Sequence, residues 1–294
     1  MIELFNTILV YPLTNILAVF IALYESVGLP GSLGLAIVSF TVFVRLLLYP
    51  MYKKQNETTQ RINALRPHLD SLKEKHKNDN VKLQQEQLRL YQEAGVNPAS
   101  GCILVLIQLP LFIALYQSLN MFVHSSGQAV DLESLNAVMY SDALKIQALD
   151  LSFLGFNLAT TPAQGMSITM LYLLIPVVTG ILQFFQASTA LTAPPASAKD
   201  TSKKKGEEKK KDTAEDFQKA MQMQMKYIFP FMIAFISYNL PVALALYWNV
   251  FSIFSIIQYY ITKSHEKKVS DISTEKKAEE GVVIKKPKKK KSKK

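Results

Sequence analysis

The sequence predicts an all-α integral membrane protein with a core of five transmembrane helices. Two observations support this fold class: the apolar residues gather into long segments with almost no charge, and the Lys and Arg residues concentrate in alternate connecting segments. Of the 294 residues, 49% are apolar or aromatic and only 19% are charged. A soluble domain places charged residues every few positions, because each of its helices needs a face in water. Several segments here have no such face.

The predicted spans lie in the long apolar segments, since a helix needs about 20 apolar residues to cross the hydrocarbon layer. The segment from 227 to 262 has no charged residue but is too long for one span. The sequence Asn239-Leu240-Pro241 in its middle predicts a turn that divides it into two helices. The five spans are therefore predicted at residues 31–51, 99–123, 166–187, 221–239 and 242–262.

The distribution of Lys and Arg predicts the orientation in the membrane. Three connecting segments are rich in these residues: nine in 52–98, eight in 188–220 and thirteen in 263–294. By contrast, 124–165 contains Lys145 alone and 1–30 contains neither residue type. Basic segments stay in the cytoplasm. The N-terminus is therefore predicted to lie outside and the C-terminus in the cytoplasm, and residues 124–165 form an extracytoplasmic loop.

Composition also predicts the segments that do not span. Residues 1–30 are expected to form an amphipathic helix in the outer interface, because Asn6, Thr14 and Asn15 interrupt their apolar character; a further span is the alternative. Residues 52–98 combine amphipathic periodicity with many charges and predict a cytoplasmic helical hairpin. Residues 188–220 and the tail 263–294 are poor in apolar residues, which predicts a disordered basic loop and a disordered basic tail.

Arg45 is the most informative residue, because it lies within an otherwise apolar span. Placing Arg at mid-span costs about 2.5–3.5 kcal/mol on insertion scales. One interpretation is that its side chain extends to the cytoplasmic surface near Pro50; the other is that it faces a water-filled cavity. No acidic residue occurs in the five predicted spans. The guanidinium must therefore be solvated by water, by neutral polar groups or by a bound segment.

Neutral polar residues in the spans provide candidates for such a pocket: Ser39, Thr41, Gln108, Gln117, Gln183, Gln186, Tyr247, Asn249, Ser252 and Gln258. Each alone is explained equally well by a hydrogen bond between helices. The four histidines lie in connecting segments without ligand spacing, and the one cysteine, Cys102, lies in an apolar run. We therefore predict no catalytic residue, no metal site and no cofactor, and the protein is not expected to be an enzyme.

Three motifs identify a known family. They are TVFVRLLLYPMYKKQ, which contains Arg45, then YQEAGVNPASGCILVLIQLPLFIALYQSL, and finally FPFMIAFISYNLPVALALYWNVFSIFSIIQYYI. In this order and spacing they resemble the YidC/Oxa/Alb family of membrane protein insertases. One difference is that Trp248 stands where the family often has Tyr.

The resemblance implies a five-helix core around a polar groove, with Arg45 in the groove and residues 4–24 as a peripheral outer helix. Gln108, Tyr247 and Trp248 would lie on helices that contribute to the groove. Together with the neutral polar candidates, the predicted substrate-contact site comprises Arg45, Gln108, Gln183, Tyr247, Trp248, Asn249 and Ser252. The implied function is to insert and fold nascent membrane proteins in the lipid bilayer of a bacterial cell membrane, as a monomer. The ribosome and the Sec translocon are further partners that the resemblance suggests.

The basic tail ends in a cluster of lysines: Lys285, Lys286, Lys288, Lys289, Lys290, Lys291, Lys293 and Lys294. They are expected to bind the ribosome or, equally well, anionic lipid. Two other functions stay open from the residues alone. A small-solute transporter or channel would need internal repeats and paired intramembrane charges. A membrane scaffold that tethers ribosomes would leave Arg45 without a role.

Overall fold

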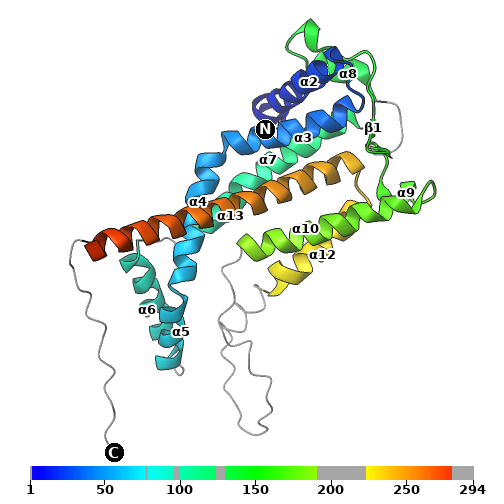
Figure 1. Cartoon of the computed structure of the whole chain (residues 1–294). Helices are drawn as coiled ribbons and strands as arrows, with labels where there is room; N and C mark the ends of the chain where they lie inside the picture. Colours follow the sequence, from blue (N-terminus) through cyan, green and yellow to red (C-terminus); the bar gives the residue numbers. More distant parts are fainter. Residues whose placement is uncertain (1, 77–78, 96–99, 124–129, 191–222, 280–294) are drawn as a thin grey trace, which may run out of the picture.

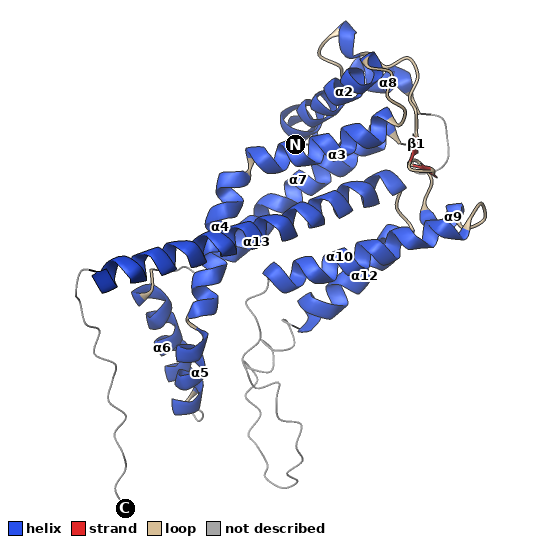
Figure 2. Cartoon of the chain, in the orientation of Figure 1, coloured by secondary structure: helices blue, strands red, loops and turns tan. Residues whose placement is uncertain are grey.

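The structure, a computed structural model, describes residues 2–76, 79–95, 100–123, 130–190 and 223–279, and these residues are mostly helical (Figures 1 and 2). The first half of the chain forms α1 (Ile2–Phe5), the π-helical turn η1 (Asn6–Val10), α2 (Tyr11–Ser26), α3 (Ser32–Leu47), α4 (Tyr49–Ala64), α5 (Arg66–Lys75), α6 (Asn80–Glu93) and α7 (Ser100–Phe122).

The second half begins with short elements and continues with long helices. Its elements are α8 (Leu132–Ala137), the 3-10 turn η2 (Asp142–Leu144), β1 (Ser152–Phe153), β2 (Phe156–Asn157), α9 (Pro162–Gly165), the 3-10 turn η3 (Met170–Leu173), α10 (Leu174–Ala190), the π-helical turn η5 (Gln224–Ile228), α12 (Phe229–Tyr238) and α13 (Val242–Glu279). The break between α12 and α13 falls at Asn239-Leu240-Pro241, where the sequence predicted a turn.

The long helices pack into a bundle with a core at one end. Helix α3 packs against α2 and α13, and α10 packs against α12 and α13 (Figure 1). One cluster of almost completely buried side chains joins four different helices, with Leu17, Phe40, Phe122 and Leu244 as members. Leu158 of the segment between α7 and α10 joins this cluster, so the core lies at the end of the bundle that this segment covers.

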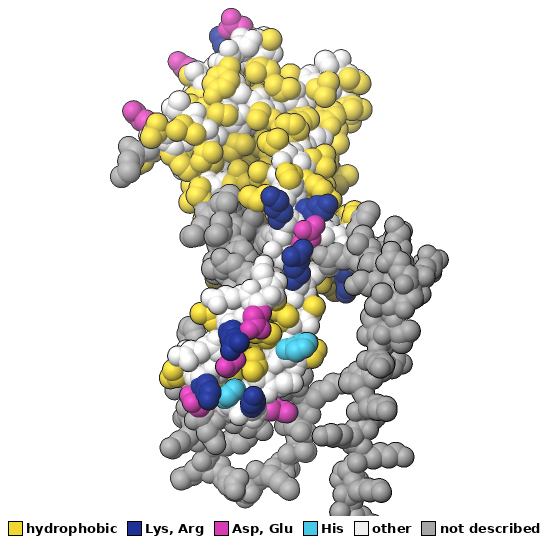
Figure 3. Space-filling view, turned by 90° about the vertical axis from the view of Figure 1, so that its left-hand side faces the viewer, with side chains coloured by type: hydrophobic (Ala, Val, Ile, Leu, Met, Phe, Trp, Pro, Cys, Tyr) yellow, Lys and Arg dark blue, Asp and Glu magenta, His cyan; other side chains and the backbone are white. Residues whose placement is uncertain are grey.

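The sides of the bundle are apolar and exposed, which suits contact with lipid chains. Three helical stretches are long and apolar enough to cross a membrane: Ile2–Ser26, Met170–Thr189 and Val242–Ser264. Helices α3 and α4 pass the same test together, and shorter apolar stretches cover Leu109–Phe122 and Lys226–Tyr238. Hydrophobic side chains cover the upper part of the molecule and charged side chains gather below them (Figure 3). The chain is therefore a multi-pass membrane protein.

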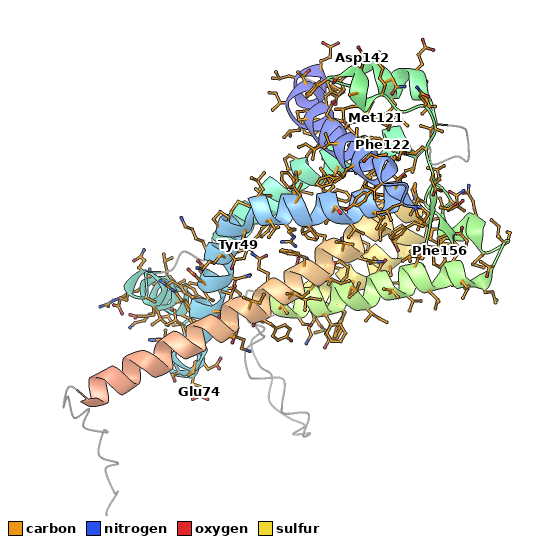
Figure 4. The ribbon with its side chains drawn as sticks, turned by 45° about the horizontal axis from the view of Figure 1, so that its top comes forward. Tyr49, Glu74, Met121, Phe122, Asp142 and Phe156 are labelled. Carbon is orange, nitrogen blue, oxygen red and sulfur yellow. The ribbon has the colours of Figure 1, made fainter. Side chains whose placement is uncertain are left out.

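Helices α3 and α4 meet at a bend of 66°. Pro50 lies in the first turn of α4, where its missing N–H costs nothing. In an uninterrupted helix the same proline would lack its hydrogen bond to the carbonyl of residue 46 and its ring would clash with that carbonyl. Helix α3 accordingly ends at Leu47, and α4 leads toward the paired helices α5 and α6. Tyr49 lies at this bend, and Glu74 lies near the far end of the α5–α6 pair (Figure 4). The bend thus places the predicted hairpin at an angle to the apolar bundle.

Two polar side chains fasten the segment between α7 and α10 to the bundle. The Asp150 carboxylate accepts hydrogen bonds from the backbone N–H of Gly31 (2.7 Å) and of Ser152 (2.9 Å). These two bonds hold the pKa of Asp150 below its usual range, and the bond from Gly31 has the larger effect. Asn15 of α2 donates to the carbonyl of Val138 (2.9 Å) and accepts from the N–H of Tyr140 (2.7 Å). Asp150 also places a negative charge at the positive N-terminal end of α3.

A small antiparallel hairpin, β1–β2, packs on α3, and the all-α prediction did not include it. Leu154 and Gly155 form its turn, with φ angles of 50° and 83°, the positive values that a two-residue turn of type I′ requires. Phe153 lies directly over Gly34 of α3, where a Cβ atom would overlap the phenyl ring. Gly34 therefore permits the contact between hairpin and helix.

The structure also extends one predicted boundary and leaves others outside the described residues. Helix α13 continues past residue 262, the predicted end of the last span, to Glu279. Residues 263–279, predicted to be disordered, thus form part of this helix. No Gly or Pro occurs between Val242 and Glu279, so nothing in the sequence stops the helix at residue 262. Residues 191–222 and 280–294, which include most of the predicted basic loop and all the tail lysines named above, lie outside the described residues.

Candidate functional site

Arg45 lies in the last turn of α3 and is only 3% exposed. Its side chain crosses to α13, where it donates to the Phe251 carbonyl (3.1 Å) and to the Ser255 hydroxyl. The guanidinium also lies over two aromatic rings, 3.6 Å from the centroid of Phe251 and 4.3 Å from that of Tyr52. A planar, weakly hydrated guanidinium suits such stacking better than an ammonium group does.

The compensation of this buried charge comes from neutral groups. The ion pairs among the described residues join Arg89 to Glu93 and Lys145 to Asp142, so neither involves Arg45. The Nε atom of Arg45 is buried and has no hydrogen-bond partner in the described part of the chain. Arg45 therefore has no carboxylate partner among the described residues and has one unused donor inside the bundle. Such a group favours a negatively charged or carbonyl-rich segment that comes close to it.

Helix α13 presents a polar face beside Arg45. Ser252, Ser255, Gln258 and Thr262 recur at helical spacing on an otherwise apolar helix, and all except Ser255 are buried. Ser252 and Thr262 satisfy their hydroxyls on carbonyls of their own helix. The Nε2 atom of Gln258, in contrast, is buried without a partner among the described residues. A polar face that is buried in a membrane helix points into the bundle, where function resides.

The other predicted site residues differ in how close they come to Arg45. The ring of Tyr247 lies 5.9 Å from that of Phe251, which itself stacks on Arg45. Trp248 packs on Phe112 of α7 at 5.2 Å and thereby joins α13 to α7.

The remaining members lie on α10, α13 and α7. Gln183 is buried on α10, a helix that packs on α13. Asn249 has a buried Oδ1 atom that accepts no hydrogen bond from the described residues. Gln108 lies on α7, and its side chain is outside the described part. Within the predicted set, Tyr247 is the residue that the described contacts connect to Arg45, through the ring of Phe251.

Ser255, Phe251 and Tyr52 contact Arg45 directly, and the sequence analysis did not select them. The spacing of Ser255, three residues after Ser252 on the same helix face, was the available signal. The aromatic residues gave no comparable signal, because aromatic side chains are common throughout membrane helices. In this conformation the rings enclose the guanidinium, and the open polar groove that the resemblance implies stays a prediction.

Comparison with known proteins places the chain in a family. The family model described as "60Kd inner membrane protein" matches residues 22–269. The chain is 31% identical over 271 residues to "Membrane protein insertase YidC 2" of Bacillus anthracis, which covers 91% of this chain and 84% of that protein. It is 33% identical over 267 residues to "Membrane protein insertase YidC" of Alkalihalophilus pseudofirmus, covering 88% of this chain and 82% of that one. The resemblance seen in the motifs is confirmed, and the chain belongs to the YidC family of membrane protein insertases.

Proposed function

We propose that this protein inserts nascent membrane proteins into the bilayer of a bacterial cell by accepting their polar segments at Arg45. The observation that supports this proposal is the buried guanidinium, which is held by neutral groups and has no carboxylate partner among the described residues. A structural cation in a bundle core is normally paired. A charge compensated only by a carbonyl, a hydroxyl and aromatic rings can exchange these partners for those of an incoming chain.

The first step is the exchange of hydrogen bonds at Arg45. A carbonyl or carboxylate of the substrate replaces the Phe251 carbonyl and the Ser255 hydroxyl, while Ser255 keeps its own bond to the Phe251 carbonyl (2.7 Å). Hydrogen bonds to a charged donor are the stronger ones, at about 1.5–3 kcal/mol each. The free Nε atom of Arg45 and the amide of Gln258 offer further donors. The substrate thus recovers part of the hydration that it loses on entering the membrane.

The second step is the movement of the apolar part of the substrate into lipid along the exposed sides of the helices. Burial of this segment in the hydrocarbon layer provides the driving force. An acidic outer segment gains about 2.3 kcal/mol per charge for each 100 mV of membrane potential. The process needs no covalent step, and the proposal assigns no catalytic residue.

We further propose that α3, α7, α10, α12 with η5, and α13 are the five spans, with α1–α2 in the outer interface. Asn15 supports the interfacial position of α2, because it bonds to the segment that carries the exposed Asp142. Asp142 and Glu74 lie at opposite ends of the molecule (Figure 4). In a Cys102→Ala background, a membrane-impermeant thiol reagent should label Asp142→Cys in intact cells. Glu74→Cys should react only after permeabilisation; the reverse pattern contradicts the proposed orientation.

The lysine-rich tail, residues 280–294, is proposed to hold the ribosome near the insertion site. Since α13 continues to Glu279, deletion of residues 280–294 removes the terminal cluster without shortening the described helix. Ribosome co-sedimentation with membranes should fall at moderate salt. Unchanged co-sedimentation, combined with weaker binding to anionic vesicles, would assign the tail to lipid. Association with the Sec translocon and function as a monomer are part of the same proposal.

The experiment for the function is complementation of an insertase-depleted bacterium. The reporter is a small single-span protein with a short acidic outer segment, and its insertion is followed by protease accessibility. We expect the wild-type chain to restore insertion. If the chain reaches the membrane in normal amount and insertion is not restored, the insertase proposal is wrong, and the transporter and scaffold functions gain support.

A further inference from the structure

A second feature lies away from Arg45, in an apolar groove between α10 and α12. These helices run side by side at an edge of the bundle (Figure 1). The groove has a volume of about 440 Å³. Its lining includes Val177, Gly180, Phe184, Pro230, Phe231 and Ala234.

The floor of the groove is set by two small residues. A Cβ atom on Gly180 would lie 3.0 Å from the Cβ of Ala234, so the two helices approach closely at this point. Larger side chains on either side, such as Phe184 and Phe231, form the walls. The groove is therefore an open apolar depression whose lowest part lies where the two helices meet at Gly180 and Ala234.

A cation lies beside one end of this groove. The Nζ atom of Lys226 is 5.9 Å from the ring centroid of Phe184, which lines the groove, and 5.3 Å from that of Tyr227. Lys226 takes part in neither of the two ion pairs found among the described residues. It precedes Pro230 by about one helical turn. A positive charge thus lies beside the Phe184 end of the apolar groove.

We propose that this groove binds an acyl chain of an anionic phospholipid, whose phosphate pairs with Lys226. Surrounding lipid tails are as apolar as the groove, so apolar burial alone gives no preference for one lipid. Selection must come from the head group, and Lys226 supplies the complementary charge. A substrate helix, at about 10–12 Å across, would rest on the rim and leave the floor at Gly180 unfilled. The combination of an apolar groove and a cation beside one end fits a lipid.

Two variants and two matched controls test the binding of the acyl chain and the binding of the phosphate head group separately. Val177→Trp fills the groove from its rim, and Val178→Trp places the same ring on the neighbouring residue of α10, which does not line the groove. Lys226→Gln removes the cation. Its control, Lys263→Gln, removes a lysine that lies 5.9 Å from the Tyr259 ring on α13.

The full-length protein is purified from membranes and exposed to equal amounts of phosphatidylglycerol and phosphatidylcholine with identical chains, and bound lipids are counted by native mass spectrometry. We expect Lys226→Gln to lower the preference for phosphatidylglycerol about fivefold relative to the wild type and both controls, the effect of one basic residue near a phosphate. The tail lysines are present in every variant and do not affect this comparison. Val177→Trp should lose bound lipid of either kind.

The proposal is overturned if Lys226→Gln keeps the full preference of the wild type or if Val177→Trp retains lipid as its control does. It is also overturned if Val177→Trp leaves lipid binding unchanged but reduces insertion of the reporter, because the groove would then contact the substrate helix. Lipid retention is measured without any insertion reaction. Failure of this proposal is therefore distinguishable from failure of the insertase function.

Discussion

The guanidinium of Arg45 lies 3.6 Å from the ring centroid of Phe251 and donates to the carbonyl of the same residue, so one residue of α13 contacts the buried charge twice. The two helices that meet here belong to opposite ends of the sequence. This contact joins them at the level where α3 ends and the bend toward α4 begins. The charge thus lies where the apolar bundle meets the cytoplasmic hairpin of the proposed topology.

Removal of the ring over Arg45 should destabilise the bundle. Phe251→Leu keeps the backbone carbonyl but loses the cation–π contact, and we expect the free energy of unfolding to fall by about 1–2 kcal/mol. Phe254→Leu is the comparison variant, because its ring lies at the distance limit of a cation–π contact, with its centroid 6.0 Å from the guanidinium. Thermal unfolding of the purified protein in detergent measures both variants. Equal losses would show that the stacking on Phe251 contributes nothing specific.

Asp150 should stabilise the protein in a pH-dependent way. Its pKa is lowered in the folded state by the N–H groups of Gly31 and Ser152, so its contribution is complete above the unfolded pKa of about 3.9 and is lost as the pH falls through the folded value. Asp150→Asn should lower the free energy of unfolding at pH 7 by about 1 kcal/mol. The difference in unfolding free energy should stay constant above about pH 3.9 and shrink below it, as the pH falls through the lowered folded pKa. A difference that does not shrink in acid would rule out the carboxylate charge as its cause.

Asn15 should hold the segment around Val138 and Tyr140 against α2. Asn15→Ala leaves the Val138 carbonyl and the Tyr140 N–H without their side-chain partner, at a cost of about 1–3 kcal/mol for each group that stays buried. Hydrogen exchange at the Tyr140 amide should become at least tenfold faster. Thr7→Ala is the control, because Thr7 bonds only to the carbonyl of Glu3 in its own helix. Unchanged exchange in Asn15→Ala would mean that other contacts hold this segment.

Gly34 and Phe153 should be energetically coupled. Gly34→Ala places a Cβ atom where the Phe153 ring lies, and overpacking of this kind costs about 1–3 kcal/mol. Phe153→Ala vacates that space, so the double variant should be more stable than the sum of the single effects predicts. Thermal unfolding of the three variants forms the test. Simple additivity would contradict the direct contact.

Hydropathy and charge could predict most of the helices, because apolar length and basic connecting segments are encoded locally. Arg45 could be selected for the same reason: a charge in an apolar span is visible without any tertiary information. The family motifs then gave the class of function. The breaks between α3 and α4, near Pro50, and between α12 and α13, at Asn239-Leu240-Pro241, also follow from local rules, since proline lacks a backbone N–H and favours a helix break or a first turn.

The partners of Arg45 could not be predicted, because the register between α3 and α13 depends on packing between residues about 200 positions apart. The bond from Gly31 to Asp150 is equally non-local, because the two residues are 119 positions apart in the sequence. The β1–β2 turn was missed for a different reason. Leu154 adopts a positive φ that favours Gly, Asn or Asp, so its residue type gave no turn signal.

The most direct test of the central claim is insertion of the acidic reporter by wild type, Arg45→Lys and Arg45→Ala in the insertase-depleted cell, with equal amounts of each variant in the membrane. We expect Arg45→Ala to reduce insertion by about tenfold, as loss of one charged hydrogen bond to the substrate implies. Arg45→Lys, which keeps the charge, should retain most of the activity. A reporter with a neutral outer segment should be affected less. Full insertion of the acidic reporter by Arg45→Ala would contradict the proposal that the buried charge of Arg45 accepts the substrate.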